Sequence, residues 1–380
     1  MDILNWSLFD ELGQSVIFSL CHLVNCPICL DMSEINFEFK TSRSFNDWLL
    51  NVGGSIAFTT YQAGKIYFLG LQSDGRLSFF DRSFPRSMGL AVSQNSNKLF
   101  LSTEYQIYEF DNLIADSTQQ GDFDAVYAPH KSWITGDLDI HGIKLDADDN
   151  PIFVNTQFNC LASLSDGYSF KPFWKPQFID RLLPEDRCHL NGLAMKDGSP
   201  RYVSCISKSN VADGWRDKGK DGGIIIDITN NEIIAENLSM PHSPEFYQGK
   251  LWILNSGTGE LGHIDTENGL FTPIAFCPGY ARGLAFVKNF AIVGLSLPRD
   301  NKTFQGLDLD NALASQDSDP RCGLLVIDIE TGNVVHWVRI EGVVKELFDT
   351  VFIPGVKCPS AIGLKTQEIL RVISVNEDDD

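Results

Sequence analysis

The segment "CHLNGLAM", residues 188–195, places a polar residue directly before a glycine and follows the glycine with an apolar run. The same pattern returns as "SMGLAV" at 87–92, "DIHGIKL" at 139–145 and "ARGLAF" at 281–286. The glycine and the apolar run recur, whereas the residue before the glycine changes from copy to copy. A segment that recurs at long, similar intervals indicates a repeat protein.

The residue before the glycine, or its best equivalent, marks the register of the repeat. The six marks are Met88, His141, Asn191, His242, Arg282 and Glu346. The first four lie about 50 residues apart, and the last gap is lengthened by a polar insert at 299–321. Each period contains short runs rich in Val, Ile, Phe, Tyr and Leu between Gly, Asn, Asp and Ser, which is typical of β-strands. Helical periodicity is nearly confined to 43–52.

Four strands in about 50 residues make one blade of a β-propeller. The six copies therefore predict an all-β fold, a six-bladed β-propeller. A strand pair at 55–71 precedes the first mark and lacks an innermost strand, whereas "KELFDTVFIPG" at 345–355 is an innermost strand without a blade. We expect the C-terminal strand to join the first blade and close the ring, which removes an exposed sheet edge. Seven blades are the alternative, with an extra blade in the N-terminal leader.

The chain divides into a leader at 1–33, the propeller at 34–360 and a C-terminal segment at 361–380 whose acidic end, "NEDDD", is expected to be disordered. The leader carries Cys21, Cys26 and Cys29. These thiols could have a metal-binding or redox role, and the alternative is that they only pack locally.

The composition limits the classes of partner. The 380 residues are 43% hydrophobic, which suits a large core, and their formal net charge is −20. So acidic a surface argues against nucleic acid and anionic membranes as partners. No apolar stretch approaches the roughly 18 residues of a membrane span, and the N-terminus begins acidic, unlike a secretory signal. We expect a cytoplasmic protein, and the sequence does not predict its oligomeric state.

The repeat also predicts where a site would lie. In a propeller the first strand of each blade lines the central channel, and glycine permits close approach of the backbones there. The marks should therefore converge on one rim of the channel. The ends of the second strands should reach the same rim with Thr60, Glu104, Gln157, Ser256 and Ser296.

Polar rim residues could do no more than bind channel water. The chemical variety of the marks favours a site, because imidazoles, a guanidinium and a carboxylate occur together, with His189 beside them. A long loop at 207–223 should overhang this rim and bring Trp215 and Arg216 to it. Its cationic side chains suggest an anionic ligand.

Several phrases between about 36 and 360 resemble an uncharacterised bacterial family of conserved hypothetical proteins. They include "FTTYQAGKIYFLG", "GDLDIHGI", "EDRCHLNGLAM", "LSMPHSPEF", "LNSGTGELG" and "KELFDTVFIPG". The organisation is more distantly similar to six-bladed propellers of the gluconolactonase and strictosidine synthase type. In the lactonase group carboxylate and amide side chains hold a divalent metal at the channel mouth, and the resemblance implies Glu346 and Asn191 as such ligands. His242 stands where an acid is expected, and imidazoles suit zinc, copper or iron better than calcium.

The resulting hypothesis is a small-molecule enzyme with its site at the channel mouth. It would hydrolyse, isomerise or condense an anionic substrate by acid–base or metal-assisted chemistry. Glu346 or His141 would act as the base, Arg282 would hold the anion, and His242 would share proton transfer. Residues expected to bind the substrate are Glu104, His189, Asn191, Trp215 and Arg216.

One divalent ion is a candidate cofactor, with His141, His242 and Glu346 as its ligands. The alternative function is a non-catalytic propeller that binds a ligand or a protein.

Overall fold

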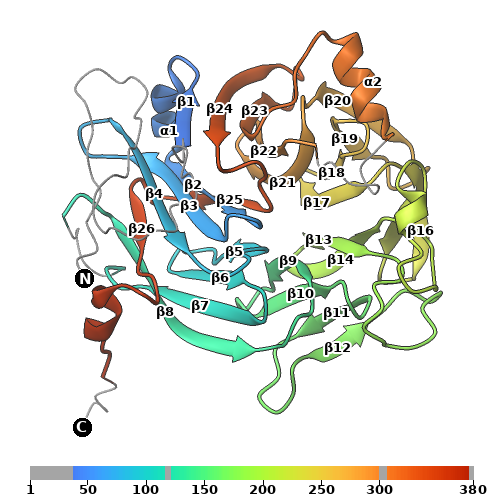
Figure 1. Cartoon of the computed structure of the whole chain (residues 1–380), viewed down its shortest axis with the longest axis horizontal. Helices are drawn as coiled ribbons and strands as arrows, with labels where there is room; N and C mark the ends of the chain where they lie inside the picture. The colour runs from blue at the N-terminus through green and yellow to red at the C-terminus, as the bar shows by residue number, and fades with distance from the viewer. Residues whose placement is uncertain (1–36, 116–120, 299–305, 376–380) are drawn as a thin grey trace, which may run out of the picture.

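The computed structural model describes residues 37–115, 121–298 and 306–375, which form six small sheets arranged as a ring (Figure 1). The predicted all-β, six-bladed propeller is confirmed. The leader, with its three cysteines and the alternative seventh blade, lies outside the described residues, as does the acidic end at 376–380. No helix in the described parts is long and apolar enough to cross a membrane.

From the channel outward, blade 1 consists of β25 (Thr350–Pro354), β2 (Gly54–Thr60), β3 (Lys65–Leu71) and β4 (Leu77–Ser83). Blade 2 consists of β5 (Leu90–Val92), β6 (Lys98–Ser102), β7 (Gln106–Asn112) and β8 (Ala125–Ile134). Blade 3 consists of β9 (Ile140–Leu145), β10 (Pro151–Asn155), β11 (Cys160–Ser163) and β12 (Lys171–Trp174).

Blade 4 consists of β13 (Leu190–Lys196), β14 (Ser199–Cys205), β15 (Gly223–Asp227) and β16 (Glu232–Leu238). Blade 5 consists of β17 (Pro241–Tyr247), β18 (Lys250–Asn255), β19 (Glu260–Ile264) and β20 (Phe271–Phe276). Blade 6 consists of β21 (Tyr280–Val287), β22 (Phe290–Ser296), β23 (Gly323–Asp328) and β24 (Val334–Gly342).

Both ends of the described chain close the ring. As predicted, β25 becomes the innermost strand of blade 1, where Pro354 pairs with Gly54 and Thr350 with Phe58. Two further closures were not predicted. Strand β1 (Phe37–Thr41) pairs with β24 at the outer edge of blade 6, and β26 (Pro359–Ala361) lies parallel to β8 at the outer edge of blade 2. Three consecutive blades, 6, 1 and 2, are thus fastened by strands from the chain ends.

Apolar side chains pack between neighbouring blades and form the core. Between blades 6 and 1, for example, Phe58 of β2 and Val326 of β23 belong to one cluster, and burial of each such side chain contributes about 1.5–3 kcal/mol. Helix α1 (Phe45–Val52) confirms the helical periodicity at 43–52. Its residues 45, 48, 49 and 52 share one face and are buried in the same cluster.

Hydroxyl groups join the blades around the channel. Near the end of the second strand of five blades, a Ser or Thr hydroxyl donates to a carbonyl at the start of the next blade's inner strand. These contacts, the hydroxyl ring, are Thr59 to Met88 (2.5 Å), Ser102 to Ile140 (3.5 Å), Thr156 to Leu190 (2.7 Å), Ser256 to Ala281 (2.6 Å) and Ser296 to Leu347 (3.2 Å). The residue after each accepting carbonyl occupies an equivalent position in every blade.

We call these six positions the inner tier. They are Gly89, His141, Asn191, His242, Arg282 and Phe348. Four of the six sequence marks therefore hold, whereas the mark in blade 2 moves from Met88 to Gly89 and the mark in blade 1 moves from Glu346 to Phe348.

Candidate functional site

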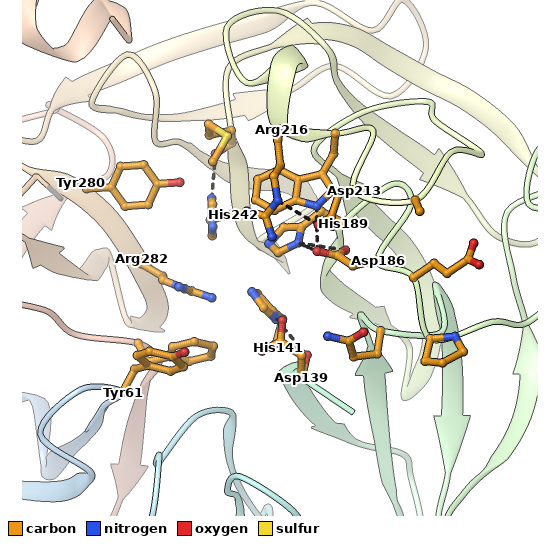
Figure 2. Close-up of a pocket in the computed structure, with 17 residues that line it drawn as sticks. Tyr61, Asp139, His141, Asp186, His189, Asp213, Arg216, His242, Tyr280 and Arg282 are labelled. Carbon is orange, nitrogen blue, oxygen red and sulfur yellow. Dashed lines mark hydrogen bonds and ion pairs between the residues drawn. The ribbon is translucent and has the colours of Figure 1, made fainter. Parts of the chain in front are cut away.

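A cavity of about 550 Å³ opens at one mouth of the channel. Inner-tier residues His141, His242, Arg282 and Phe348 form part of its lining. Residues two positions upstream of the inner tier form a second layer, the outer tier, which contributes Asp139, His189, Met240 and Tyr280. Figure 2 shows Arg282, His141 and His189 pointing toward a common space.

The outer tier has an unusual backbone in three successive blades. Asp139, His189 and Met240 have φ values of 50°, 47° and 48°. Positive φ is uncommon outside glycine and is found preferentially at functional sites. The turn has a local consequence in blades 3 and 5, because it directs the carbonyl of the outer-tier residue onto the imidazole two residues later.

His141 and His242 are held by these carbonyls. His141 Nδ1 lies 2.9 Å from the Asp139 carbonyl oxygen, and His242 Nδ1 lies 2.8 Å from the Met240 carbonyl oxygen. A carbonyl can only accept, so Nδ1 carries the proton in both rings. Burial, followed by the charges of His189 and Arg282, lowers the pKa of His141 well below its usual value. His141 is therefore a neutral imidazole at neutral pH, with its lone pair on Nε2.

His189 belongs to a buried group of three side chains. Its Nδ1 lies 2.8 Å from Asp186 Oδ2, and Trp215 Nε1 donates to the same oxygen at 2.7 Å. The indole also stacks on the imidazole, with ring centroids 3.9 Å apart. All three residues are buried. Because the Asp186 carboxylate accepts at Nδ1, Nε2 is the nitrogen of His189 left for a substrate.

A cation and a further carboxylate complete the cavity floor. The Arg282 guanidinium carbon lies 3.6 Å from the centroid of the Phe348 ring, a cation–π contact. Burial raises the pKa of Asp139, although His189, Arg86 and Arg282 oppose that shift. Arg86 is bound to Asp139 at 2.9 Å. The floor thus contains one guanidinium over an aromatic ring, next to imidazoles in defined tautomers.

A second, much smaller space shares part of this floor. This lower chamber, of about 20 Å³, is also lined by His141, His242 and Arg282, together with Lys144, Asn191, Glu245 and Asp349. Lys144 forms an ion pair with Glu245. Burial lowers the pKa of Lys144, but Glu245 and Asp349 outweigh it and leave that pKa raised. The chamber is large enough for about one water molecule.

Six of the nine predicted site residues line the main cavity, namely His141, His189, Trp215, Arg216, His242 and Arg282. Asn191 faces only the lower chamber, where its buried Nδ2 has no hydrogen-bond partner among the residues that the structure describes. Glu346 does not line either space. Its Oε1 accepts from the backbone N–H of Gln62 at 2.7 Å, and its side chain is buried. Glu104 is exposed and lines neither space.

The metal set predicted from the sequence does not assemble. Within residues 37–115, 121–298 and 306–375, no three His, Cys, Asp or Glu side chains are placed to hold a metal ion. Glu346 is bound to a backbone amide instead, and the positive charge of Arg282 lies beside His141. These residues therefore do not fit the divalent site that the lactonase resemblance implies.

The structure adds site residues that the repeat pattern did not predict. They include Tyr61, Asp139, Glu185, Asp186, Tyr280 and Phe348. Only Asp186 had a local sequence signal, because an acid three residues before a histidine can reach its ring across a tight turn.

The chain is only distantly similar to solved structures. A chain of a nidogen/laminin complex is 12% identical, with 80% of this chain and 99% of that chain covered and a TM-score of 0.48. TolB from Acinetobacter baumannii is 12% identical over 79% of this chain and 67% of its own, with a TM-score of 0.46. Virginiamycin B lyase from Staphylococcus aureus is 13% identical over 68% of this chain and 96% of its own, with a TM-score of 0.37.

No curated protein sequence matches this chain significantly. A family profile does match, and it spans residues 43–362, almost the whole propeller. The chain belongs to the family described as the domain of unknown function DUF4915.

Proposed function

We propose that the protein is an enzyme that acts on a small polar anion by acid–base chemistry at the channel mouth. The observation that carries this proposal is the Asp186–His189 pair, whose remaining ring nitrogen serves the same cavity as Arg282. In this assignment His189 is the general base and Arg282 binds the anionic group. The volume of the cavity suits a small molecule.

The charges of the lining support an anionic substrate. Apart from Asp186, each carboxylate in the lining has an arginine partner. These pairs are Asp139 with Arg86, Glu185 with Arg187 and Asp213 with Arg216. The cation on the floor, Arg282, lies over an aromatic ring. An anionic group of the substrate would meet this guanidinium, whose charge also acts on Asp139 and Asp349.

The imidazole tautomers support a substrate that also carries hydroxyl groups. His141 presents an Nε2 lone pair, and His189 does so when it is neutral. Two such acceptors are complementary to hydroxyl donors on the substrate. The best candidates are therefore small hydroxy acids and the lactones or esters derived from them.

The proposed chemistry is proton transfer at His189. Nε2 takes a proton from the substrate, or from a water that attacks it, and the Asp186 carboxylate stabilises the imidazolium that forms. Arg282 stabilises negative charge that develops on the substrate. A positioned base of this kind accounts for about 10²–10⁴-fold of rate acceleration. Isomerisation, elimination and hydrolysis all use this arrangement.

The test is a panel of small hydroxy acids and their lactones, each followed by ¹H NMR in D₂O with the purified full chain. We expect conversion, or exchange of a carbon-bound proton, for at least one compound. His189→Gln should lower turnover at least ~100-fold and retain binding, whereas Arg282→Gln should mainly weaken binding. His263→Gln and Arg201→Gln are matched controls, because His263 lies on β19 and Arg201 pairs with Asp227 outside the cavity.

Binding of panel compounds without any turnover would instead establish the non-catalytic ligand-binding propeller. Turnover that survives His189→Gln unchanged would refute the assignment of the base.

A further inference from the structure

The two longest insertions of the repeat meet beside the cavity. One is the loop at 206–222 between β14 and β15 of blade 4, and the other contains α2 (Asp308–Ser315) between β22 and β23 of blade 6. Their contact is a single apolar cluster, comprising Ile206, Trp215, Met240, Tyr280, Leu307, Leu309 and Leu313. Segments about 100 residues apart in the sequence thus share one small core.

Hydrogen bonds hold one insertion against blade 5 and the other against the connection that leads into blade 5. The amide of Leu309 donates to the Gly257 carbonyl at 2.8 Å. On the other side, the Ser239 hydroxyl donates to the Gly219 carbonyl at 3.1 Å. The meeting point is therefore built into the ring from three blades, and Trp215 is the member whose side chain contacts both Asp186 and His189.

We propose that Trp215 is a positioning residue for His189, and that α2 acts on the site through this indole. The inference rests on the proposed role of His189 as the base. Trp215 makes two different contacts with the pair: its N–H fixes the Asp186 oxygen that faces His189, and its ring covers one face of the imidazole. The other neighbour of that imidazole is His141, whose ring lies edge-on with a centroid distance of 4.6 Å.

The physical reason is the orientation of the carboxylate. An aspartate held by one donor can rotate about its last side-chain bond, and the imidazole can follow it. A second donor on the same oxygen leaves one orientation in which both hydrogen bonds are linear. The stacked indole then prevents the imidazole from turning away. Without Trp215 the pair would still form, but Nε2 would no longer hold one direction into the cavity.

The decisive variant is Trp215→Phe, which keeps an aromatic ring on His189 and removes the N–H. The readout is the Nδ1 proton of His189, observed by NMR on protein labelled with ¹⁵N-histidine and assigned with His189→Gln. We expect the wild-type protein to show a single Nδ1–H tautomer. In Trp215→Phe the Nδ1 proton should exchange with solvent at least tenfold faster. With a panel substrate, kcat should fall while KM changes little.

Trp252→Phe is the matched control. Trp252 is a buried indole on blade 5 that donates to a backbone carbonyl, and its ring lies against His263. The Trp252→Phe variant should leave the His189 signal unchanged. Leu309→Ala tests the path from α2, because it removes an apolar contact of the cluster without touching the pair, and it should change the His189 signal in the same direction by a smaller factor.

An unchanged His189 signal in both Trp215→Phe and Leu309→Ala overturns the inference. Faster exchange with unaltered turnover leaves Trp215 as a positioning residue and removes His189 from the role of base, so the two proposals can fail separately. If Trp215→Phe fails to fold, the Leu309→Ala spectrum decides.

Discussion

Blades 3, 4 and 5 differ from blades 1 and 2 in what they bring to the channel. Blades 3, 4 and 5 are each formed by one continuous stretch of chain, and each supplies one imidazole to the cavity. These imidazoles are His141, His189 and His242. In the inner tier of blades 1 and 2 stand Phe348 and Gly89. These two blades instead receive strands β25 and β26 from the C-terminal part of the chain.

The three imidazoles of the cavity and strands β25 and β26 therefore belong to different blades, and we call blades 3 to 5 the histidine side and blades 1 and 2 the closing side. Blade 6 lies between them, because β1 fastens it and its Arg282 lines the cavity. Blade 1 is complete only when β25 pairs with β2. Its inner-tier residue is apolar, and the ring of this residue, Phe348, packs against Arg282. Blades 3 to 5 need no strand from elsewhere in the chain, so they can carry strained turns and buried polar groups. Changes on the closing side should therefore affect folding, and changes on the histidine side should affect ligands and pH dependence.

The largest expected effect is on the closing side. A chain that ends at Val344 lacks β25 and β26, which exposes the fully buried strand β2 as a sheet edge. We expect it to be insoluble or to lack a cooperative thermal transition. The control ends at Val375 and should unfold like the full chain. A soluble monomer ending at Val344 with a sharp transition would show that the ring does not depend on this closure.

The next effect separates two glycines of the repeat on the histidine side. A Cβ at Gly192 would lie 2.3 Å from Pro244 Cδ, whereas at Gly142 the nearest atom would be 3.7 Å away. Gly192→Ala should lower the free energy of unfolding by about 1–3 kcal/mol, and Gly142→Ala should change it by about 0.5 kcal/mol or less. Urea unfolding measures both. Equal losses would show that the glycine has the same role in every blade.

The pH dependence of stability tests the histidine side more finely. The pKa of His141 is lowered in the folded protein, so below its unfolded value of about 6.5 the unfolded chain binds the extra proton. The free energy of unfolding should therefore fall as the pH drops below about 6.5, by at most about 1.4 kcal/mol per pH unit from this group.

His141→Gln should flatten this part of the profile. The comparison must be made between the two proteins, because the raised pKa values of Asp139, Glu245 and Asp349 act in the opposite direction at lower pH. Parallel profiles for wild type and variant would mean that His141 titrates normally.

The smallest expected effect is deletion of residues 1–33. These precede β1, the first strand that fastens blade 6, and the repeat begins after them. The melting temperature should change by less than about 2 °C in differential scanning calorimetry. A drop of several degrees would show that residues 1–33 also contribute to the stability of the ring.

Much of the fold could be predicted because each blade repeats one phrase. The spacing of His141 and Asn191 sets the blade size, and the unpaired innermost strand at 345–355 indicated the closure. Strands β1 and β26 escaped prediction because they are short additions that carry no repeat phrase. Whether such a segment pairs depends on which sheet edge lies nearby in three dimensions.

The site could be predicted only as far as the repeat phrase aligns. Blade 1 has Asp349 where the phrase has its glycine, so the alignment slipped by two residues and selected Glu346 in place of Phe348. Asp186 reaches His189 through backbone with φ values of 41° and 47°, and hydrophobic patterning does not report such turns. Trp215 was expected at the rim, but its hydrogen bond to Asp186 depends on the conformation of a long loop, which local sequence patterns do not report.

The hydroxyl ring holds the inner strands through their backbone carbonyls. The position of such a strand therefore does not depend on which side chain its inner-tier residue carries. Thr156 holds the strand that carries Asn191, and Ser256 holds the strand that carries Arg282, yet neither hydroxyl touches the side chain it helps to place. In evolutionary terms, the contact that aligns a strand and the side chain that this strand displays can change independently. We therefore expect relatives of this chain to differ at inner-tier positions such as Asn191 and Arg282 while their rings remain superimposable.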